Sequence, residues 1–175
     1  YPKQARPTVG TKQGAVLANA NIHQKAGLLG LNHRYSFSST LNNTTSLYGF
    51  YNETENPAIQ NYELKKEPHW GGRTTFIYGL ENFSVHFGGE LQKGNFTSRT
   101  FRNLQGSRGA QLTDDDLGLW QWMAFAQLNY RANKWLFTLG ASKNNLQLDF
   151  LRSSETPNIE ANKKFSGELQ PRFAV

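Results

Sequence analysis

The strictest pattern in this sequence is an alternation of apolar and polar side chains with a period of two residues. Between residues 83 and 92, the odd positions carry Phe, Val, Phe, Gly and Leu, and the even positions carry Ser, His, Gly, Glu and Gln. Successive side chains of a β-strand point to opposite faces, so this period predicts a strand with one apolar and one polar face. The pattern recurs at 120–130 and 135–142. One shared apolar face is predicted for Phe83, Val85, Phe87, Trp120, Trp122, Trp135, Phe137 and Leu139.

Further runs with strand character lie at 27–37, 44–52, 73–78 and 165–175. A slip of register, as at a β-bulge, is expected near 143–145. No helical period competes over more than a turn or two, and glycines recur inside the runs, where they would destabilise a helix. The sequence therefore predicts an all-β protein, an antiparallel up-and-down meander of about seven to eight strands.

The connections between these runs alternate in length. Short connections are expected at 38–42, 80–82 and 131–134, and long polar loops at 53–72, 93–118 and 153–163. Outer-membrane barrels have short periplasmic turns and long extracellular loops, whereas a soluble sandwich has no physical reason for this rhythm. Aromatic residues also gather beside the short turns, as they do at headgroup level in such barrels. We therefore expect the strands to be part of a transmembrane β-barrel, with the three short turns at one end of the sheet.

The chain divides into two expected parts. Residues 1–24 hold Pro2, Pro7, Gly10 and Gly14 and are predicted to be an irregular N-terminal segment or an extracellular loop, and residues 25–175 to be the β-barrel portion. The longest uninterrupted apolar runs have only a few residues. A helical membrane span needs ~20, so a helical membrane protein is excluded.

Several classes of chemistry lack support in the sequence. The chain has no Cys, and none of its four His residues has a partner at metal-binding spacing. Asp114, Asp115 and Asp116 lack the Gly and Glu of a Ca²⁺-binding loop, so we expect a solvated acidic loop. No nucleophile or phosphate-binding motif is present. The net charge is +6, but the basic residues are dispersed. We expect no enzyme activity, metal site, cofactor or nucleic-acid partner.

Several segments resemble strands of a known family of proteins: LNHRYSF at 31–37, LYGFY at 47–51, GGRTTF at 71–76, FGGELQ at 87–92, AQLNY at 126–130 before WLFTLGAS at 135–142, and LQPRF at 169–173. Together, over roughly residues 28–175, they resemble the barrel of TonB-dependent outer-membrane receptors. The resemblance implies a cell outer-membrane location, contact with its lipid, and import of ferric siderophores or a similar scarce nutrient.

The family's barrel of about 22 strands encloses a plug, and TonB supplies the energy for import. Segments matching the plug and the TonB-contacting motif are not found in this sequence. The chain is therefore expected to be an internal part of such a barrel, which meets TonB through parts outside these residues.

Two of the expected loops carry arginines and aromatic rings. Converging at a barrel mouth, such groups would suit an anionic, partly aromatic ligand such as a ferric chelate, through charge-assisted hydrogen bonds and stacking. The candidate ligand-binding residues, all expected in loops, are Tyr62, His69, Trp70, Arg73, Arg99, Phe101, Arg102 and Arg108.

Two other classes of protein remain open at this point. A small soluble β-barrel of lipocalin type would bind an apolar ligand inside and would turn the face of Phe83 and Phe87 inward. An outer-membrane barrel would turn that face to lipid. A soluble adhesive or structural β-sheet domain would need neither lipid nor ligand.

Overall fold

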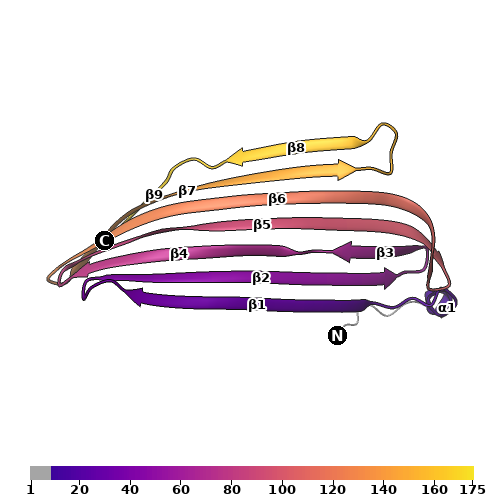
Figure 1. The fold of residues 1–175 in the computed structure, drawn as a ribbon, viewed down its shortest axis with the longest axis horizontal. Coiled ribbons are helices and arrows are strands. Elements are labelled where there is room, and N and C mark those ends of the chain that lie inside the picture. Colours follow the sequence, from indigo (N-terminus) through magenta and orange to yellow (C-terminus); the bar gives the residue numbers. More distant parts are fainter. Residues whose placement is uncertain (1–8) are drawn as a thin grey trace.

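The computed structural model describes residues 9–175, which form one helix and a single antiparallel sheet (Figure 1). The elements are α1 (Val9–Leu17), β1 (His23–Ser36), β2 (Leu41–Pro57), β3 (Asn61–Lys66), β4 (His69–Leu80), β5 (Phe83–Leu104), β6 (Ser107–Ala132), β7 (Trp135–Arg152), β8 (Ile159–Ser166) and β9 (Gln170–Ala174). The prediction of an all-β, antiparallel meander is confirmed. Helix α1 differs from the irregular segment expected at 1–24.

The nine strands occupy seven parallel tracks across the sheet, here called lanes. Strands β3 and β4 share the lane between β2 and β5, and β8 and β9 share the lane beside β7. The first shared lane is interrupted at Glu67 and Pro68, because proline has no N–H to donate to the ladder. The backbone still bridges the gap, since Glu67 N donates to Asn52 O at 2.8 Å and Asn95 N donates to Pro68 O at 3.0 Å.

Three tight turns lie together at the left end of the sheet in Figure 1, as the sequence predicts. They join β1 to β2 through residues 37–40, β4 to β5 through 81–82, and β6 to β7 through 133–134. Asn133 adopts a positive φ of 52°, which an asparagine tolerates in a two-residue turn. We call this end of the strands the turn end, and the opposite end the far end.

Of the three long loops expected at the far end, 53–72 and 93–118 are wrong, and 153–163 is confirmed only in part, as a loop over 153–158. Strands β5 and β6 pair through most of 93–118, from Lys93 opposite Trp120 to Leu104 opposite Ser107. Their turn has only two residues, Gln105 and Gly106, at φ of 56° and 92°. The segment 53–72 likewise contains the end of β2, all of β3 and the start of β4. Polar side chains on both faces remove the two-residue period, so sequence periodicity cannot find these strand extensions.

The register slip expected at 143–145 is absent between β6 and β7, but on the other side of β7 the register changes by one residue where β9 replaces β8 as the partner, between Ser142 and Asn145. Pairing between β6 and β7 is unbroken from Asp115 opposite Arg152 to Ala132 opposite Trp135. Register shifts also lie between β5 and β6, on either side of Phe101. Because β7 keeps its register, Leu146 and Leu148 point to the face opposite that of Phe137.

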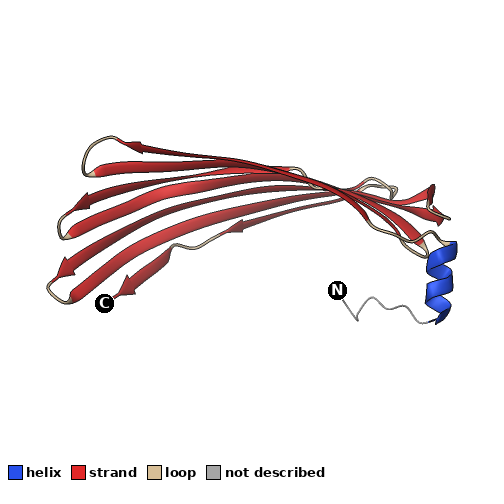
Figure 2. Ribbon diagram, turned by 90° about the horizontal axis from the view of Figure 1, so that it is seen from below, coloured by secondary structure: helices blue, strands red, loops and turns tan. Residues whose placement is uncertain are grey.

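The described chain is one curved layer with no second layer packed against it (Figure 2). Within residues 12–175, the buried apolar side chains are Pro57, Tyr62 and Leu64, the last two being 6% and 8% exposed. Large apolar side chains such as Leu29 (80%) and Phe37 (57%) are open along the sheet. Because domains normally bury the apolar face of a sheet against another element, this face requires a cover from outside the described residues.

One side chain ties the far end of the sheet to α1. The Asn103 amide donates to the carbonyl oxygens of Ala18 at 2.7 Å and Ala58 at 2.6 Å, and its oxygen accepts from Gly106 N at 2.7 Å. It therefore joins the segment after α1 to the β2–β3 and β5–β6 turns.

We expect Asn103→Ala to destabilise this junction by about 1–3 kcal/mol, because three part-buried partners lose their hydrogen bonds. Faster amide hydrogen exchange at Gly106 and around Ala58 measures the effect. Asn21→Ala is the control, since the Asn21 amide donates only to the nearby exposed Asn19 carbonyl. Equal exchange in both variants would contradict the assignment.

Candidate functional site

The strand register divides the sheet into an apolar face and a polar face, because residues opposite each other in antiparallel strands point the same way. Across β5, β6 and β7, Phe83 aligns with Tyr130 and then Phe137. On the other face, Ser84 aligns with Asn129 and then Thr138. The predicted shared face is confirmed for its full set, Phe83, Val85, Phe87, Trp120, Trp122, Trp135, Phe137 and Leu139.

Aromatic rings line the turn end of the apolar face. Ring centroids lie 4.8 Å apart between Tyr35 and Phe37, 6.3 Å between Phe37 and Phe76, and 5.2 Å between Phe76 and Phe87. These contacts run from β1 to β5. The turn-side aromatic row, as defined by register, comprises Tyr35, Phe37, Phe76, Tyr78, Phe83, Phe87, Tyr130, Trp135, Phe137 and Phe173.

A second group of rings lies further along the same face. This far aromatic row comprises Tyr51, Trp70, Trp120 and Trp122. All four tryptophans of the chain therefore lie on the apolar face. Beyond the row the same face becomes polar, with Glu53 on β2, Asn95 on β5 and Asp116 on β6. Between the rows it carries mostly aliphatic and small side chains: Leu29, Leu31, Leu47, Val85, Leu91, Ala124, Ala126, Leu128, Leu139 and Ala141.

Several polar side chains interrupt the band between the two rows: His33 on β1, Lys143 and Asn145 on β7, and a cluster around Asn43 whose groups hydrogen-bond to one another. Asn43 donates to the Thr74 hydroxyl at 2.9 Å and the Thr75 carbonyl at 3.2 Å, and Thr45 donates to the Asn43 side-chain oxygen at 3.0 Å. The two threonine hydroxyls lie 2.9 Å apart. Internally paired polar groups cost far less to remove from water than unpaired ones.

The polar face is crossed by side-chain hydrogen bonds between strands. Asn129 accepts from Thr138 and from Gln127, each at 3.0 Å, and donates to Ser84 at 3.3 Å. Asn32 donates to Ser46 at 2.7 Å near the β1 edge. This face is built to meet water or other polar groups.

The structure does not gather the predicted ligand-binding residues at one place. None is in a loop, so that part of the prediction is wrong. Tyr62 lies on β3, three residues on β4 (His69, Trp70, Arg73), three on β5 (Arg99, Phe101, Arg102) and Arg108 on β6. By register, Trp70, Tyr62 and Arg99 belong to the apolar side, and His69, Arg73 and Arg102 to the opposite side. Residues on opposite faces of one sheet cannot converge on one ligand.

Tyr62 and Arg108 do come together, around a carboxylate that the sequence analysis missed. The Tyr62 hydroxyl donates to Glu55 at 2.7 Å, Arg108 donates to the same carboxylate at 2.8 Å, and the guanidinium lies 5.3 Å from the Tyr62 ring centroid. The hydrogen bond from Tyr62, with a further contribution from the charge of Arg108, lowers the pKa of Glu55 against an opposing effect of burial. No sequence signal links residues 55, 62 and 108, because three strands bring them together.

Two other candidate arginines also have carboxylate partners. Arg99 donates to Asp114 at 3.0 Å. Arg73 lies 3.9 Å from Glu90 and 5.3 Å from the Phe125 ring centroid. Their positive charges are largely compensated within the sheet, which weakens the case for capture of an anion.

The three consecutive aspartates lie on β6 rather than in a loop. Asp114 pairs with Arg99, and Asp115 accepts two hydrogen bonds from Arg152, at 2.6 Å and 2.8 Å. The bonds from Arg152 lower the pKa of Asp115. No group of three or more His, Cys, Asp or Glu side chains placed to hold a metal ion occurs among the described residues.

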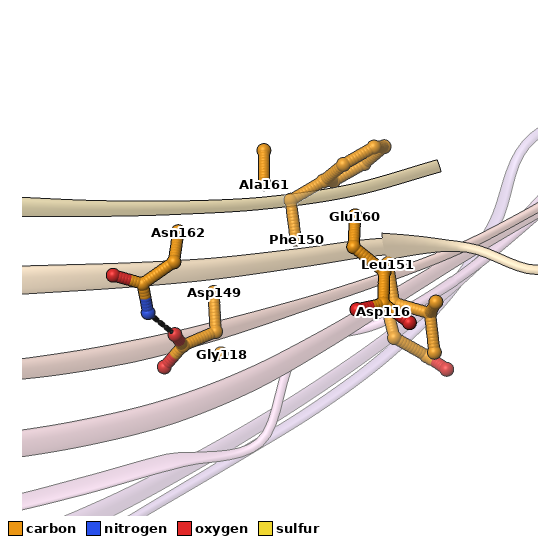
Figure 3. Close-up of a pocket in the computed structure, with 8 residues that line it drawn as sticks. All are labelled: Asp116, Gly118, Asp149, Phe150, Leu151, Glu160, Ala161 and Asn162. Atoms are coloured by element: carbon orange, nitrogen blue, oxygen red, sulfur yellow. Dashed lines mark hydrogen bonds between the residues drawn. The ribbon is translucent and has the colours of Figure 1, made fainter. Parts of the chain in front are cut away.

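A shallow hollow of about 520 Å³ opens across β6, β7 and β8 (Figure 3). Its lining includes the carboxylates of Asp116, Asp149 and Glu160, and Asn162 donates a hydrogen bond to Asp149. Three carboxylates repel anions, so this hollow does not suit a ferric chelate of negative charge.

Comparison with known proteins adds no assignment. No protein-family model matches the chain, and no curated protein matches it either. Within the described residues, the one helix is too short and too polar to cross a membrane. The class that the coordinates define is therefore an all-β protein with nine antiparallel strands in one meander-like sheet.

The lowered pKa of Glu55 predicts that the far end of the sheet is less stable at acidic pH. A carboxyl group whose pKa is lowered by folding stabilises the fold above its unfolded pKa and loses that contribution as the pH falls through the folded value. From the ordinary value of 4.5 downward, the far end should loosen, with faster amide exchange in β3.

We expect Glu55→Gln to remove most of this acid sensitivity from β3. Glu81→Gln, in a turn at the opposite end of the sheet, should leave it unchanged. An identical pH profile of β3 exchange in wild type and Glu55→Gln would refute the coupling.

Proposed function

We propose that this chain forms part of the wall of a transmembrane β-barrel in the cell outer membrane, with its apolar face turned to lipid. The observation that carries the proposal is the apolar band bounded by two aromatic rows, because outer-membrane barrels have such a band between two aromatic girdles. The self-paired cluster of Asn43, Thr45 and Thr74 supports it, since polar groups in lipid must find partners within the protein.

The positions of the turns support a barrel independently. The β6–β7 hairpin closes at Ala132. The β4–β5 hairpin closes at Phe83, whose partner on β6 is Tyr130, so it closes two residues short of Ala132. The β1–β2 hairpin closes near Leu41, which aligns with Tyr78, again two residues short of Leu80. Each strand is thus staggered by one residue. A stagger of ~3.4 Å per strand spacing of ~4.8 Å corresponds to a tilt of ~35°, within the range of β-barrels.

The separation of the aromatic rows fits a bilayer. Tyr130 and Trp120 lie ten positions apart along β6. At ~3.4 Å per residue and a tilt of ~35°, that spacing spans ~28 Å along the barrel axis, close to the ~25 Å apolar band of outer-membrane barrels. The β5–β6 hairpin continues beyond Trp120 to Ser107, so it would rise well above the membrane.

The sheet supports a barrel that is completed by other strands. Strand β1 and the β8–β9 lane are its two edges, and within residues 9–175 they are not paired with each other. Unpaired edges within a bilayer would leave backbone groups without partners, so further strands must flank them.

The resemblance to TonB-dependent receptors specifies the proposal further: import of ferric siderophores or a similar scarce nutrient, powered by TonB, without an enzymatic step. The extension of β5 and β6 is compatible with the tall exterior of such a receptor. Convergence of the candidate arginines no longer supports this proposal, because three of the four are paired with carboxylates and their faces differ.

A small soluble barrel of lipocalin type is the competing proposal. It would bury the two aromatic rows around an apolar ligand. The long polar extension of the β5–β6 hairpin favours the membrane barrel, and the direction of the apolar face decides between the two.

The tryptophans test the proposal, because all four lie on the apolar face. In a background with every Trp changed to Phe, Leu128→Trp places an indole in the middle of the band, and Gln127→Trp places one on the polar face. After reconstitution in vesicles, we expect lipids brominated deep in the acyl chain to quench Leu128→Trp strongly and Gln127→Trp weakly.

Absence of quenching from both positions would exclude a lipid-facing apolar surface and favour the soluble barrel. Native-like far-ultraviolet circular dichroism of each variant is the control for folding.

Ferric chelates should bind weakly or not at all to these 175 residues by themselves. Three of the four candidate arginines are paired with carboxylates, so an anion would have to displace them. Titration calorimetry with a panel of ferric siderophores measures this. Tight binding that is lost in Arg102→Gln would refute the expectation and place the ligand on the polar side of β5.

A further inference from the structure

One cross-strand row at the border of the apolar band combines tryptophan with lysine. Trp70 on β4 aligns with Lys93 on β5, which aligns with Trp120 on β6. The row continues through Gln147 on β7 to Lys164 on β8. All five side chains point to the apolar face, and we call them the lysine–tryptophan row.

The basic groups of this row have no acidic partner within it. In the part of the chain that the structure describes, neither Lys93 nor Lys164 is in an ion pair; those present involve Lys65, Arg73, Arg99, Arg108 and Arg152. The nearest carboxylate one step along this face, Asp149, accepts hydrogen bonds from Gln147 at 3.1 and 3.2 Å and one from Asn162. The two ammonium groups are therefore available to an external anion.

The indoles beside Lys93 add hydrogen-bond donors to its positive charge. Trp70 and Trp120 are 52% and 37% exposed, and each indole carries one N–H donor. At ~4.8 Å between lanes, Lys93 has an indole on either side within one lane spacing. Such side chains anchor at the membrane–water interface, where a lysine stem lies along the acyl chains and its ammonium reaches the headgroups.

We propose that the lysine–tryptophan row binds the phosphate groups of anionic membrane lipids. The proposal rests on the apolar face being turned to lipid. Lys93, between two indoles, binds one headgroup phosphate, and Lys164, ~14 Å away across three lanes, binds a second. The acidic residues further along this face, Asp116, Asp149 and Glu160, keep the headgroups from moving beyond the row by repulsion.

The test measures which lipid lies next to the row. Trp122→Phe and Trp135→Phe leave Trp70 and Trp120, both in the row, as the only tryptophans, and excitation near the red edge of indole absorption avoids the tyrosines. The chain is reconstituted in mixtures of phosphatidylcholine and phosphatidylglycerol in which only one of the two lipids is brominated. The ratio of quenching by the two brominated lipids gives the relative affinity of the row for the anionic lipid.

We expect preference for phosphatidylglycerol of about 25-fold, or about fivefold for each lysine, as charges near an anionic surface produce. Lys93→Gln with Lys164→Gln should abolish it, and high salt should weaken it. The matched control is Lys12→Gln with Lys163→Gln, which removes two charges outside the row. Lys163 is adjacent to Lys164 but aligns with Leu148 on the polar face.

The outcomes separate this inference from the proposed function. Equal quenching by both lipids, or an unchanged preference in Lys93→Gln with Lys164→Gln, overturns the lipid site while leaving the lipid-facing sheet intact. An equal loss in the control pair also overturns it, because net charge alone would then explain the preference. Absence of quenching by either brominated lipid overturns both.

Discussion

The antiparallel register is the constraint on which every other feature of this protein depends. A shift of one residue in any strand would move its aromatic side chains to the polar face and its amides and hydroxyls to the apolar face. The ladder from Lys93 opposite Trp120 to Phe83 opposite Tyr130 is continuous, and so is the ladder from Tyr130 opposite Phe137 onward. Two chemically distinct surfaces therefore emerge from one layer of backbone.

Because there is only one layer, the environment must complete the structure. A sheet normally loses its apolar face against a helix or a second sheet. Here most large apolar side chains remain open, and the described residues bury only Pro57, Tyr62 and Leu64 among apolar ones. In the middle of that face, the polar side chains of Asn43, Thr45 and Thr74 hydrogen-bond to one another. The bilayer that we propose as this cover would account for both the aromatic borders and the internal pairing.

Charge is organised differently at the far end of the sheet. There the strands leave the apolar band, and ion pairs such as Glu55 with Arg108 and Asp115 with Arg152 link neighbouring lanes. These contacts hold exposed strand extensions in register where no apolar face does so. They also explain why arginines that look available in the sequence are partners of carboxylates in the fold, whereas Lys93 lies between the indoles of Trp70 and Trp120.

The sequence by itself determined the all-β fold, the three turns at one end and the shared face of Phe83, Trp120 and Trp135. A strand with one apolar face shows an alternation of apolar and polar residues that can be seen in the sequence. Only the tertiary structure decided that 93–118 is a long hairpin, since strands that are polar on both faces leave no period to detect. It also decided which side chains meet: Glu55, Tyr62 and Arg108 come from three strands, and Trp70, Lys93 and Trp120 from three others. Such groupings depend on the register between strands, a long-range property that no local pattern encodes.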